Sequence, residues 1–370
     1  MTAALFTPLH LGPVELPNRI AVPPMCQYSA DDGSMTDWHL YHLMNLAMSG
    51  AGLVTVEATG VERRGRITHG CVGLYSDHNE AAMKRAIDAA RAVALPGTKF
   101  AIQLAHAGRK ASCDLPWKGG RPLTAEQDAW TTVAPSAVPF AADWHTPQAL
   151  DEASMARVRE AFVQAARRAA RIGFDAIELH MAHGYLMHEF YSPLSNRRSD
   201  DFGGSRDNRL RFPLSVARAV AAALPPHMAW GARITGKDWV EGGWDVDDAI
   251  ALAAALEEAG ASFVCVSSGA NAPDARIPIG LGYQTHLATA VKQAVSLKVR
   301  AVGMIVTPQQ ANDLVAKGEA DWVAIGRAML DDPRWGWRAA EALGVEIERP
   351  PQYLRAGPKT WRALLTPVRG

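Results

Sequence analysis

His180-Met181-Ala182-His183-Gly184-Tyr185 is the stretch that says most about this fold, together with Pro23-Pro24-Met25-Cys26-Gln27-Tyr28. Each stretch follows a short apolar run typical of a β-strand, residues 176–179 before the first and residues 20–22 before the second. Two imidazoles and a phenol at one strand exit, and a thiol and a phenol at another, indicate side chains that converge on one face of a sheet. In a parallel barrel that face carries the chemistry.

Further apolar runs extend this pattern along the chain. The candidate strands are 20–22, 53–57, 100–104, 176–179, 229–234, 263–266, 300–302 and 322–325, and the candidate helices are 38–48, 79–93, 154–172, 208–224, 246–259, 286–295, 308–316 and 335–343. Gly173 is the expected C-terminal cap of the third helix, and Pro308 suits the first turn of the seventh. The alternation predicts an α/β fold, a (β/α)8 TIM barrel. A doubly wound sheet is the alternative, but its first strand would end in a glycine-rich turn rather than in two prolines.

The domain organisation follows from length and composition. The chain has 370 residues, of which 48% are hydrophobic, and we expect one domain over residues 1–370. After the third strand comes an insertion, residues 105–150, that is rich in proline and tryptophan. We expect it to be a capping loop over the site or an accessory hairpin on the barrel rim. Residues 344–370 form a C-terminal tail.

Charge and cysteine content exclude several classes. Lysine plus arginine and aspartate plus glutamate both total 38, which argues against nucleic acid as the main partner. The four cysteines are far apart in sequence, which argues against a zinc ribbon, an iron–sulfur cluster or a disulfide framework. No apolar run approaches the ~20 residues of a membrane span. Residues 1–17 do not have the pattern of a signal peptide, so we expect a cytoplasmic protein with no membrane partner.

Two glycines predict a phosphate site. Gly303 follows the seventh strand, and Gly326-Arg327 follows the eighth. Barrels frequently bind a ligand phosphate at these loops, where glycine lets backbone N–H groups approach the oxygens and arginine adds charged donors. The alternative is two ordinary turn glycines and a surface arginine.

Four motifs together resemble one known family. They are Pro23 to Tyr28; Gln103-Leu104-Ala105-His106-Ala107-Gly108-Arg109-Lys110; His180-x-x-His183-x-Tyr185; and Ser195 to Ser205 followed by Asn208-Arg209. They are similar to those of the old yellow enzyme family of ene-reductases, specifically its bacterial subclass with a cysteine near the flavin. The resemblance implies a (β/α)8 barrel, a tightly bound flavin mononucleotide (FMN), and NADPH or NADH as reductant. It also implies reduction of the activated C=C bond of α,β-unsaturated carbonyls, maleimides or nitroalkenes, in ping-pong kinetics.

The resemblance assigns cofactor-binding residues. The segment along the flavin ring comprises Pro23, Pro24, Met25 and Cys26, and the phosphate site comprises Gly303, Gly326 and Arg327. Cys26 would tune the flavin potential, unless it is only a small buried side chain. Ala58 and Gln103 end or follow strands, and Gln103 could bind the pyrimidine edge or tie two barrel loops together. Arg233 would stabilise the reduced flavin, unless Glu57 or Glu178 neutralises it.

The resemblance also assigns substrate and catalytic residues. His180 and His183 would donate hydrogen bonds to the substrate oxygen. Tyr185 would protonate the α-carbon after hydride transfer from FMN to the β-carbon, and Tyr28 would gate the substrate or bind its oxygen. A zinc site at the histidine pair is the less favoured alternative, because zinc needs a third protein ligand. Tyr185 could also be a buried tyrosine with its hydroxyl satisfied locally.

The tail carries one more match. Arg355, in Pro351-Gln352-Tyr353-Leu354-Arg355, matches an arginine that in the subclass reaches into the neighbouring subunit's active site. A homo-oligomer, either a dimer or a dimer-based tetramer, is therefore implied. The chain continues past Arg355, and Trp361 is an alternative residue for completing that site.

Two other functions stay open, a flavin-binding redox sensor and a barrel lyase or isomerase for a phosphorylated substrate. The sequence indicates neither the physiological substrate nor a preference between NADPH and NADH.

Overall fold

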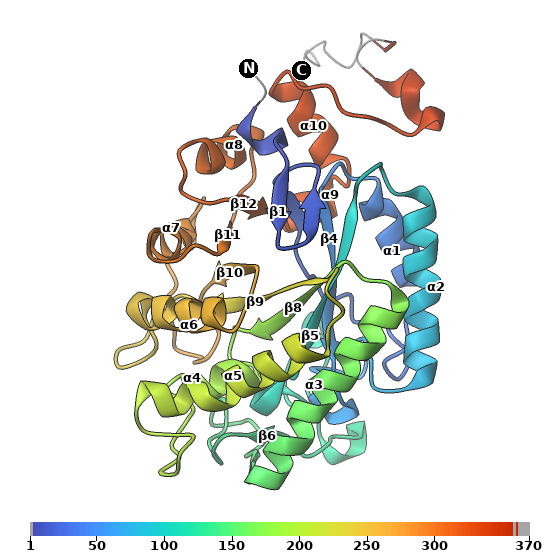
Figure 1. Ribbon diagram of the computed structural model, residues 1–370. Helices are drawn as coiled ribbons and strands as arrows, with labels where there is room; N and C mark the ends of the chain where they lie inside the picture. The colour runs from blue at the N-terminus through green and yellow to red at the C-terminus, as the bar shows by residue number, and fades with distance from the viewer. Residues whose placement is uncertain (1–2, 358–359, 362–370) are drawn as a thin grey trace.

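A closed barrel of parallel strands forms the centre of the molecule (Figure 1). The computed structural model describes residues 3–357, 360 and 361. Within them the strand order around the barrel is β10-β11-β12-β3-β4-β5-β8-β9. The strands are β3 (Ile20–Val22), β4 (Leu53–Gly60), β5 (Lys99–Ala105), β8 (Ala176–Met181), β9 (Ala229–Thr235), β10 (Phe263–Ser267), β11 (Lys298–Ala301) and β12 (Trp322–Ala324). The predicted (β/α)8 barrel is confirmed.

Helices surround the barrel and cover its outer face (Figure 1). The longer ones are α1 (Asp37–Ala47), α2 (Asp77–Val93), α3 (Glu152–Ile172), α5 (Arg206–Ala223), α6 (Val246–Glu258), α7 (Thr285–Ala294), α8 (Pro308–Ala316) and α10 (Trp335–Ala342). Gly173 ends α3 in the left-handed conformation, at φ 95°, as the expected cap. Two short helices, α4 (Leu186–Tyr191) and α9 (Arg327–Asp331), were not predicted. In the part of the chain that the structure describes, no helix combines the length and apolar character needed to cross a membrane.

A hairpin closes the amino-terminal end of the barrel, and the sequence did not predict it. It consists of β1 (Leu9–Leu11) and β2 (Val14–Leu16), which pair antiparallel. Its inward side chains form a second apolar cluster with barrel residues, among them Leu53, Phe263 and Trp322. A separate, larger core lies between the strands and the helices. The hairpin therefore seals the end of the barrel opposite the carboxyl ends of the strands.

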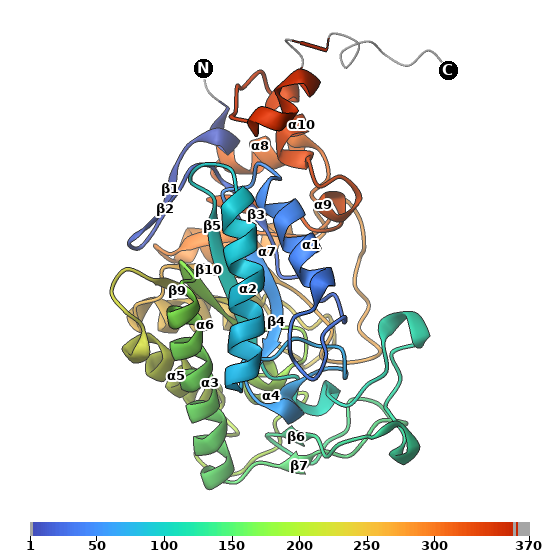
Figure 2. The same cartoon turned by 90° about the vertical axis from the view of Figure 1, so that its right-hand side faces the viewer.

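The segment between β5 and α3 extends away from the barrel. It contains the 3-10 turns η3 (Gly108–Lys110), η4 (Pro116–Lys118) and η5 (Ala125–Gln127) and the short strands β6 (Val133–Ala134) and β7 (Gln148–Ala149). Figure 2 shows it in teal at the lower right, far from α10. Trp130 Nε1 donates to Arg64 O at 2.9 Å, and the Arg198 guanidinium donates to Pro135 O at 2.9 Å and to Leu150 O at 2.6 Å. These bonds fasten the segment to the barrel loops.

Candidate active site

A cavity of about 760 Å³ lies at the carboxyl ends of the later barrel strands. Its lining brings together five of the predicted site residues: His183, Arg233, Gly303, Gly326 and Arg327. They come from β9 and from the segments that follow β8, β11 and β12. The volume is in the range of pockets that hold cofactors or drug-sized ligands.

The β11 and β12 loops form one end of this cavity. Gly303 has φ 125°, and a Cβ atom there would lie 2.5 Å from Gln284 Cγ, so both the backbone and the packing require glycine. Gly326 immediately precedes α9, and Arg327 is the first residue of that helix. The Arg327 side chain is exposed and makes no hydrogen bond or ion pair with another described residue. Its guanidinium is therefore available to a ligand at the cavity.

The segment after β3 lies against the β12 loop. A Cβ atom at Gly326 would lie 3.5 Å from Pro23 Cγ and 3.7 Å from Met25 Sδ. Pro23 is buried, whereas Pro24, Met25 and Cys26 are half-buried. Burial raises the pKa of the Cys26 thiol, as do nearby Glu57 and Cys71. Cys26 is thus a protonated thiol at neutral pH, with the weak donor character of an S–H group.

The two histidines and Tyr185 of the opening motif form one cluster at the end of β8. The His180 ring centre lies 5.2 Å from that of His183 and 5.0 Å from that of Tyr185, with edge-to-face geometry in both pairs. His183 Nε2 lies 2.7 Å from Ser267 Oγ. Burial and, second, the positive charge of Arg233 lower the pKa of both imidazoles well below its usual value. Both rings are therefore neutral at pH 7, and each carries one N–H donor.

The Tyr185 phenol is not satisfied locally. Its hydroxyl makes no hydrogen bond with any residue in the described ranges. Burial, followed by nearby Cys26 and Tyr28, raises the pKa of Tyr185 well above its usual value. Tyr185 therefore keeps its proton across the physiological range and has no internal acceptor for it.

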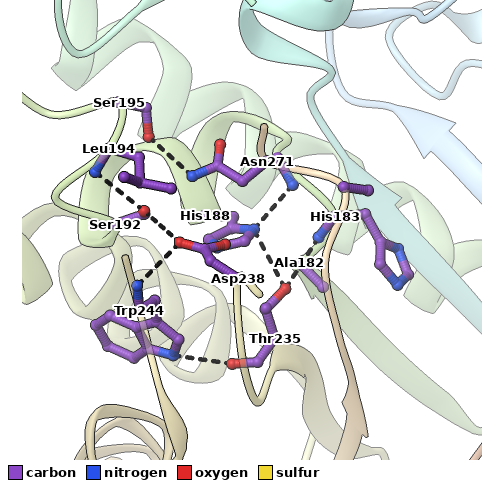
Figure 3. Close-up of polar contacts among 12 residues, drawn as sticks. Ala182, His183, His188, Ser192, Leu194, Ser195, Thr235, Asp238, Trp244 and Asn271 are labelled. Carbon is purple, nitrogen blue, oxygen red and sulfur yellow. Dashed lines mark hydrogen bonds and ion pairs between the residues drawn. The ribbon is translucent and has the colours of Figure 1, made fainter. Parts of the chain in front are cut away.

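A buried polar network holds the loop after β8, which carries His183 and Tyr185, and Figure 3 shows the residues of this network. Thr235 Oγ1, at the end of β9, accepts from His183 N at 3.1 Å and lies 3.2 Å from His188 Nδ1. His188 Nδ1 also accepts from Gly184 N at 2.8 Å, and its Nε2 lies 3.0 Å from Asp238 Oδ1. Although burial opposes it, the contact with His188, followed by bonds from Ser192 and Trp244, holds the pKa of Asp238 below its usual value. The network therefore fixes the backbone amides of His183 and Gly184.

Arg233 has no carboxylate partner among the described residues. Its Nη2 reaches Ser267 Oγ at 3.4 Å, and its buried Nε has no partner. Glu57 instead accepts from Gln27 N at 3.0 Å and lies 3.4 Å from His39 Nε2. Arg233 thus keeps an uncompensated positive charge beside the cavity.

Glu178, the other carboxylate that might have neutralised Arg233, is engaged inside the barrel. It forms a fully buried ion pair with Arg300 and accepts from Gln103 Nε2 at 2.7 Å. Gln103 therefore ties β5 to the neighbouring strand β8, a tie between strands rather than between loops. Ala58 is paired with Gln103 across β4 and β5, next to a register shift at Glu57.

The two other predicted substrate residues differ in position: Tyr28 lies near Cys26 and Tyr185, and Arg355 lies away from the cluster. Tyr28, at φ 51°, makes an edge-to-face contact with Trp117 of the long insertion, with ring centres 5.9 Å apart. Arg355 is exposed in the turn η6 (Pro351–Ala356) and does not line the cavity of its own chain. Trp361 is also exposed. The structure therefore brings neither tail residue to this site within one chain.

Sequence reasoning assigned no role to several residues that contact the cluster. Ser267 and Thr235 contact His183, and His188 and Asp238 support the same loop. Lys110 Nζ lies 5.2 Å from the Tyr185 ring centre. Lys110 ends one of the four quoted motifs, which was the one available signal for it.

The fold and this site define a class: (β/α)8 barrel enzymes with a cavity at the carboxyl ends of the strands, lined by arginine side chains and a neutral imidazole. The chain belongs to the NADH:flavin oxidoreductase / NADH oxidase family, the old yellow enzyme family, which matches residues 4–346. It is therefore an enzyme that uses FMN with a nicotinamide reductant. Membership of the cysteine-containing subclass stays a prediction.

Individual relatives agree with this assignment. The chain is 38% identical over 364 residues to an NADPH dehydrogenase of Geobacillus thermodenitrificans, covering 98% of this chain and 100% of the relative. It is 40% identical over 362 residues to an NADH:flavin oxidoreductase of Gibberella zeae, covering 93% and 87%. Among solved structures, morphinone reductase in complex with tetrahydroNAD superposes with a TM-score of 0.75 at 28% identity, over 94% of this chain and 93% of that one. A 2-naphthoyl-CoA reductase complex, at 23% identity and TM-score 0.83, shares the fold over 92% of this chain and 53% of its own length.

The residues present fit FMN on independent structural grounds. The unpartnered Arg233 Nε is a buried donor without an acceptor, which an anionic or polar ligand would supply. Arg327 and the Gly303 and Gly326 backbone lie at one end of the same cavity, where a phosphate can be bound.

Proposed function

We propose that this enzyme reduces the activated C=C bond of electron-poor alkenes, namely α,β-unsaturated carbonyls, maleimides or nitroalkenes. FMN, when bound, supplies a hydride to the β-carbon. The observation that carries the proposal is the Tyr185 phenol, protonated and without an internal acceptor, beside two neutral imidazoles. An alkene reductase needs a proton donor and donors to the substrate oxygen together, and a simple electron carrier needs neither.

His180 and His183 bind the carbonyl or nitro oxygen of the substrate in this proposal. Their N–H donation stabilises the negative charge that develops on that oxygen, and losing one such donor typically costs about 10²–10³ in rate. The bond between His183 Nε2 and Ser267 Oγ orients the ring. Tyr185 then donates its phenol proton to the α-carbon, which completes the addition of two hydrogens.

The cofactor residues divide by the part of FMN that they would hold. We assign Gly303, Gly326 and Arg327 to the phosphate and the positive charge of Arg233 to the ring system. The segment along the ring comprises Pro23, Pro24, Met25 and Cys26. Ala58 and Gln103 would face the pyrimidine edge, and the bond from Gln103 to Glu178 holds that amide in place.

Tyr28 would gate the entrance to the pocket or bind the substrate oxygen. The nicotinamide would use the same pocket as the alkene. Morphinone reductase in its complex with tetrahydroNAD supports a nicotinamide bound directly on this fold. Shared use of one pocket predicts ping-pong kinetics. We also propose a homo-oligomer in which Arg355 or Trp361 completes a neighbouring subunit's site. Both residues are exposed here, which is compatible with a contact between subunits.

Anaerobic reduction tests the proposal. The purified protein, loaded with FMN, is reduced by NADPH or NADH and then mixed with cyclohexenone, a maleimide or a nitroalkene. We expect reduction by at least one nicotinamide and rapid reoxidation by at least one alkene. Reduction without reoxidation by any alkene would favour the redox sensor. The raised pKa of Cys26 argues against a sensor that acts through a reactive thiolate.

A further inference from the structure

Lys110 joins the two loops that meet beside the catalytic cluster. Its Nζ donates to His183 O at 2.9 Å and to Ala270 O at 2.7 Å. His183 belongs to the loop after β8 and Ala270 to the loop after β10. The same ammonium lies 5.2 Å from the centre of the Tyr185 ring and 4.8 Å from that of Phe140, which belongs to the long insertion.

The two loops are in direct contact where Lys110 binds them. A Cβ atom at Gly184 would lie 2.4 Å from Ala270 O. His183 and Ala270 have φ 60° and 68°, a left-handed conformation that residues with a side chain rarely adopt. Such conformations persist only where the surroundings impose them, and here the carbonyls of both residues accept from one ammonium.

We propose that Lys110 is a positioning residue for proton donation: its ammonium fixes the loop of His183 and Tyr185 against the loop after β10. The inference rests on the proposed function, because the group that it positions is the proposed proton donor. A shift of about 1 Å in a reacting group can cost about 10²-fold in rate. The cation beside the Tyr185 ring also favours the negative charge that the phenol gains as its proton leaves.

The charged and titratable groups around Lys110 set a pH dependence. Burial lowers the pKa of Lys110 to about 8; Glu189 opposes the shift, Arg109 adds to it and Cys113 opposes it. Glu189, on α4, has a pKa raised by burial to about 8, and His180 and His183 are neutral. The ammonium is therefore present below about pH 8 and is lost as the pH rises above it. Proton donation should weaken over the same range.

The test compares Lys110→Met with wild type in the FMN-loaded protein. The flavin is reduced with dithionite and reoxidised either by an alkene or by ferricyanide, which takes electrons and needs no proton from Tyr185. We expect reoxidation by the alkene to slow about 10–100-fold and reoxidation by ferricyanide to change less than about threefold. Amide hydrogen exchange over residues 183–186 and 270–272 should be faster in the variant, with and without FMN. Lys84→Met, an exposed lysine paired with Asp88 on α2, should match wild type throughout.

A pH profile separates positioning from a merely structural role. In wild type the rate of reoxidation by the alkene should fall above about pH 8. Lys110→Arg keeps the positive charge, so the fall should move to higher pH. Glu189→Gln keeps Lys110, so the variant should still show an alkaline fall in this rate. The inference would be overturned if Lys110→Met and wild type were reoxidised by the alkene at the same rate, or if Lys110→Met slowed equally with both oxidants. A pH profile that is the same in Lys110→Arg and wild type would also overturn it. If Lys110→Met does not fold, the profiles of wild type and Lys110→Arg decide. Failure of wild type with every alkene instead rejects the proposed function, and hydrogen exchange still tests the loop contact.

Discussion

Replacing Tyr185 by phenylalanine removes one oxygen from the site and little else. The ring keeps its edge-to-face contact with His180, at 5.0 Å between centres, and its position beside the Lys110 ammonium. The hydroxyl makes no hydrogen bond with the described residues, so no internal bond is lost. We expect the free energy of unfolding to change by less than about 0.5 kcal/mol, as for substitutions that disturb no packing or buried bond.

The effect on catalysis should be much larger. A positioned general acid contributes about 10²–10⁴ in rate, which is about 2.7–5.4 kcal/mol of activation free energy at 1.36 kcal/mol for each factor of ten. Reduction by the nicotinamide requires no proton from Tyr185 and should change less than about threefold. Because the pKa of Tyr185 is raised, its own titration should produce no alkaline fall in rate near pH 8.

Stopped-flow absorbance of the flavin measures the two halves of the cycle separately. FMN-loaded Tyr185→Phe is first reduced by NADPH and, in a second experiment, the reduced enzyme is reoxidised by an alkene. Tyr41→Phe is the matched control, since its exposed ring lies on α1. The assignment of Tyr185 as proton donor would be refuted if the alkene reoxidised Tyr185→Phe as fast as wild type. It would also be refuted if the rates of reduction and reoxidation fell by the same factor.

Further substitutions test the cofactor site, the barrel interior and the loop contact. Arg327→Ala should weaken FMN binding about 10–100-fold, the value of a hydrogen bond to a charged group, in a titration of flavin-free protein. Arg300→Met leaves Glu178 buried without its ion-pair partner and should lower the free energy of unfolding by about 3–5 kcal/mol in urea denaturation. Gly184→Ala combines φ 71° with a backbone clash and should lower both thermal stability and the alkene rate, whereas Gly280→Ala, with open space around it, should do neither.

Much of the fold could be predicted because barrel strands and covering helices have different apolar periods. Short uninterrupted apolar runs and stripes such as the one on α3 located the strands and longer helices closely. The missed elements are too short to show a period: α4 has six residues, α9 has five, and each strand of the β1–β2 hairpin has three. Their formation depends on packing against the barrel rather than on local sequence.

The site was predicted where its residues lie at strand ends, because parallel strands bring those ends to one edge. His183, Arg233 and Gly303 meet in one cavity for that reason. Partners on loops from different strands could not be found in this way. Lys110, for example, reaches His183 from the turn η3 after β5, and only the folded chain places it there.

The acidic partners inside the barrel show why the site can carry positive charge. Glu178 is held by Arg300 and Gln103, and Glu57 by Gln27 N and His39, so neither neutralises Arg233. Burial, followed by the positive charge of this guanidinium, lowers the pKa of both nearby imidazoles and so keeps them neutral. In the proposed reaction negative charge develops on both the cofactor and the substrate oxygen. Because Glu178 and Glu57 are held by other partners, the site carries a positive charge before the substrate binds. That charge is opposite to the negative charge that the reaction creates, so the stabilising group is already in place.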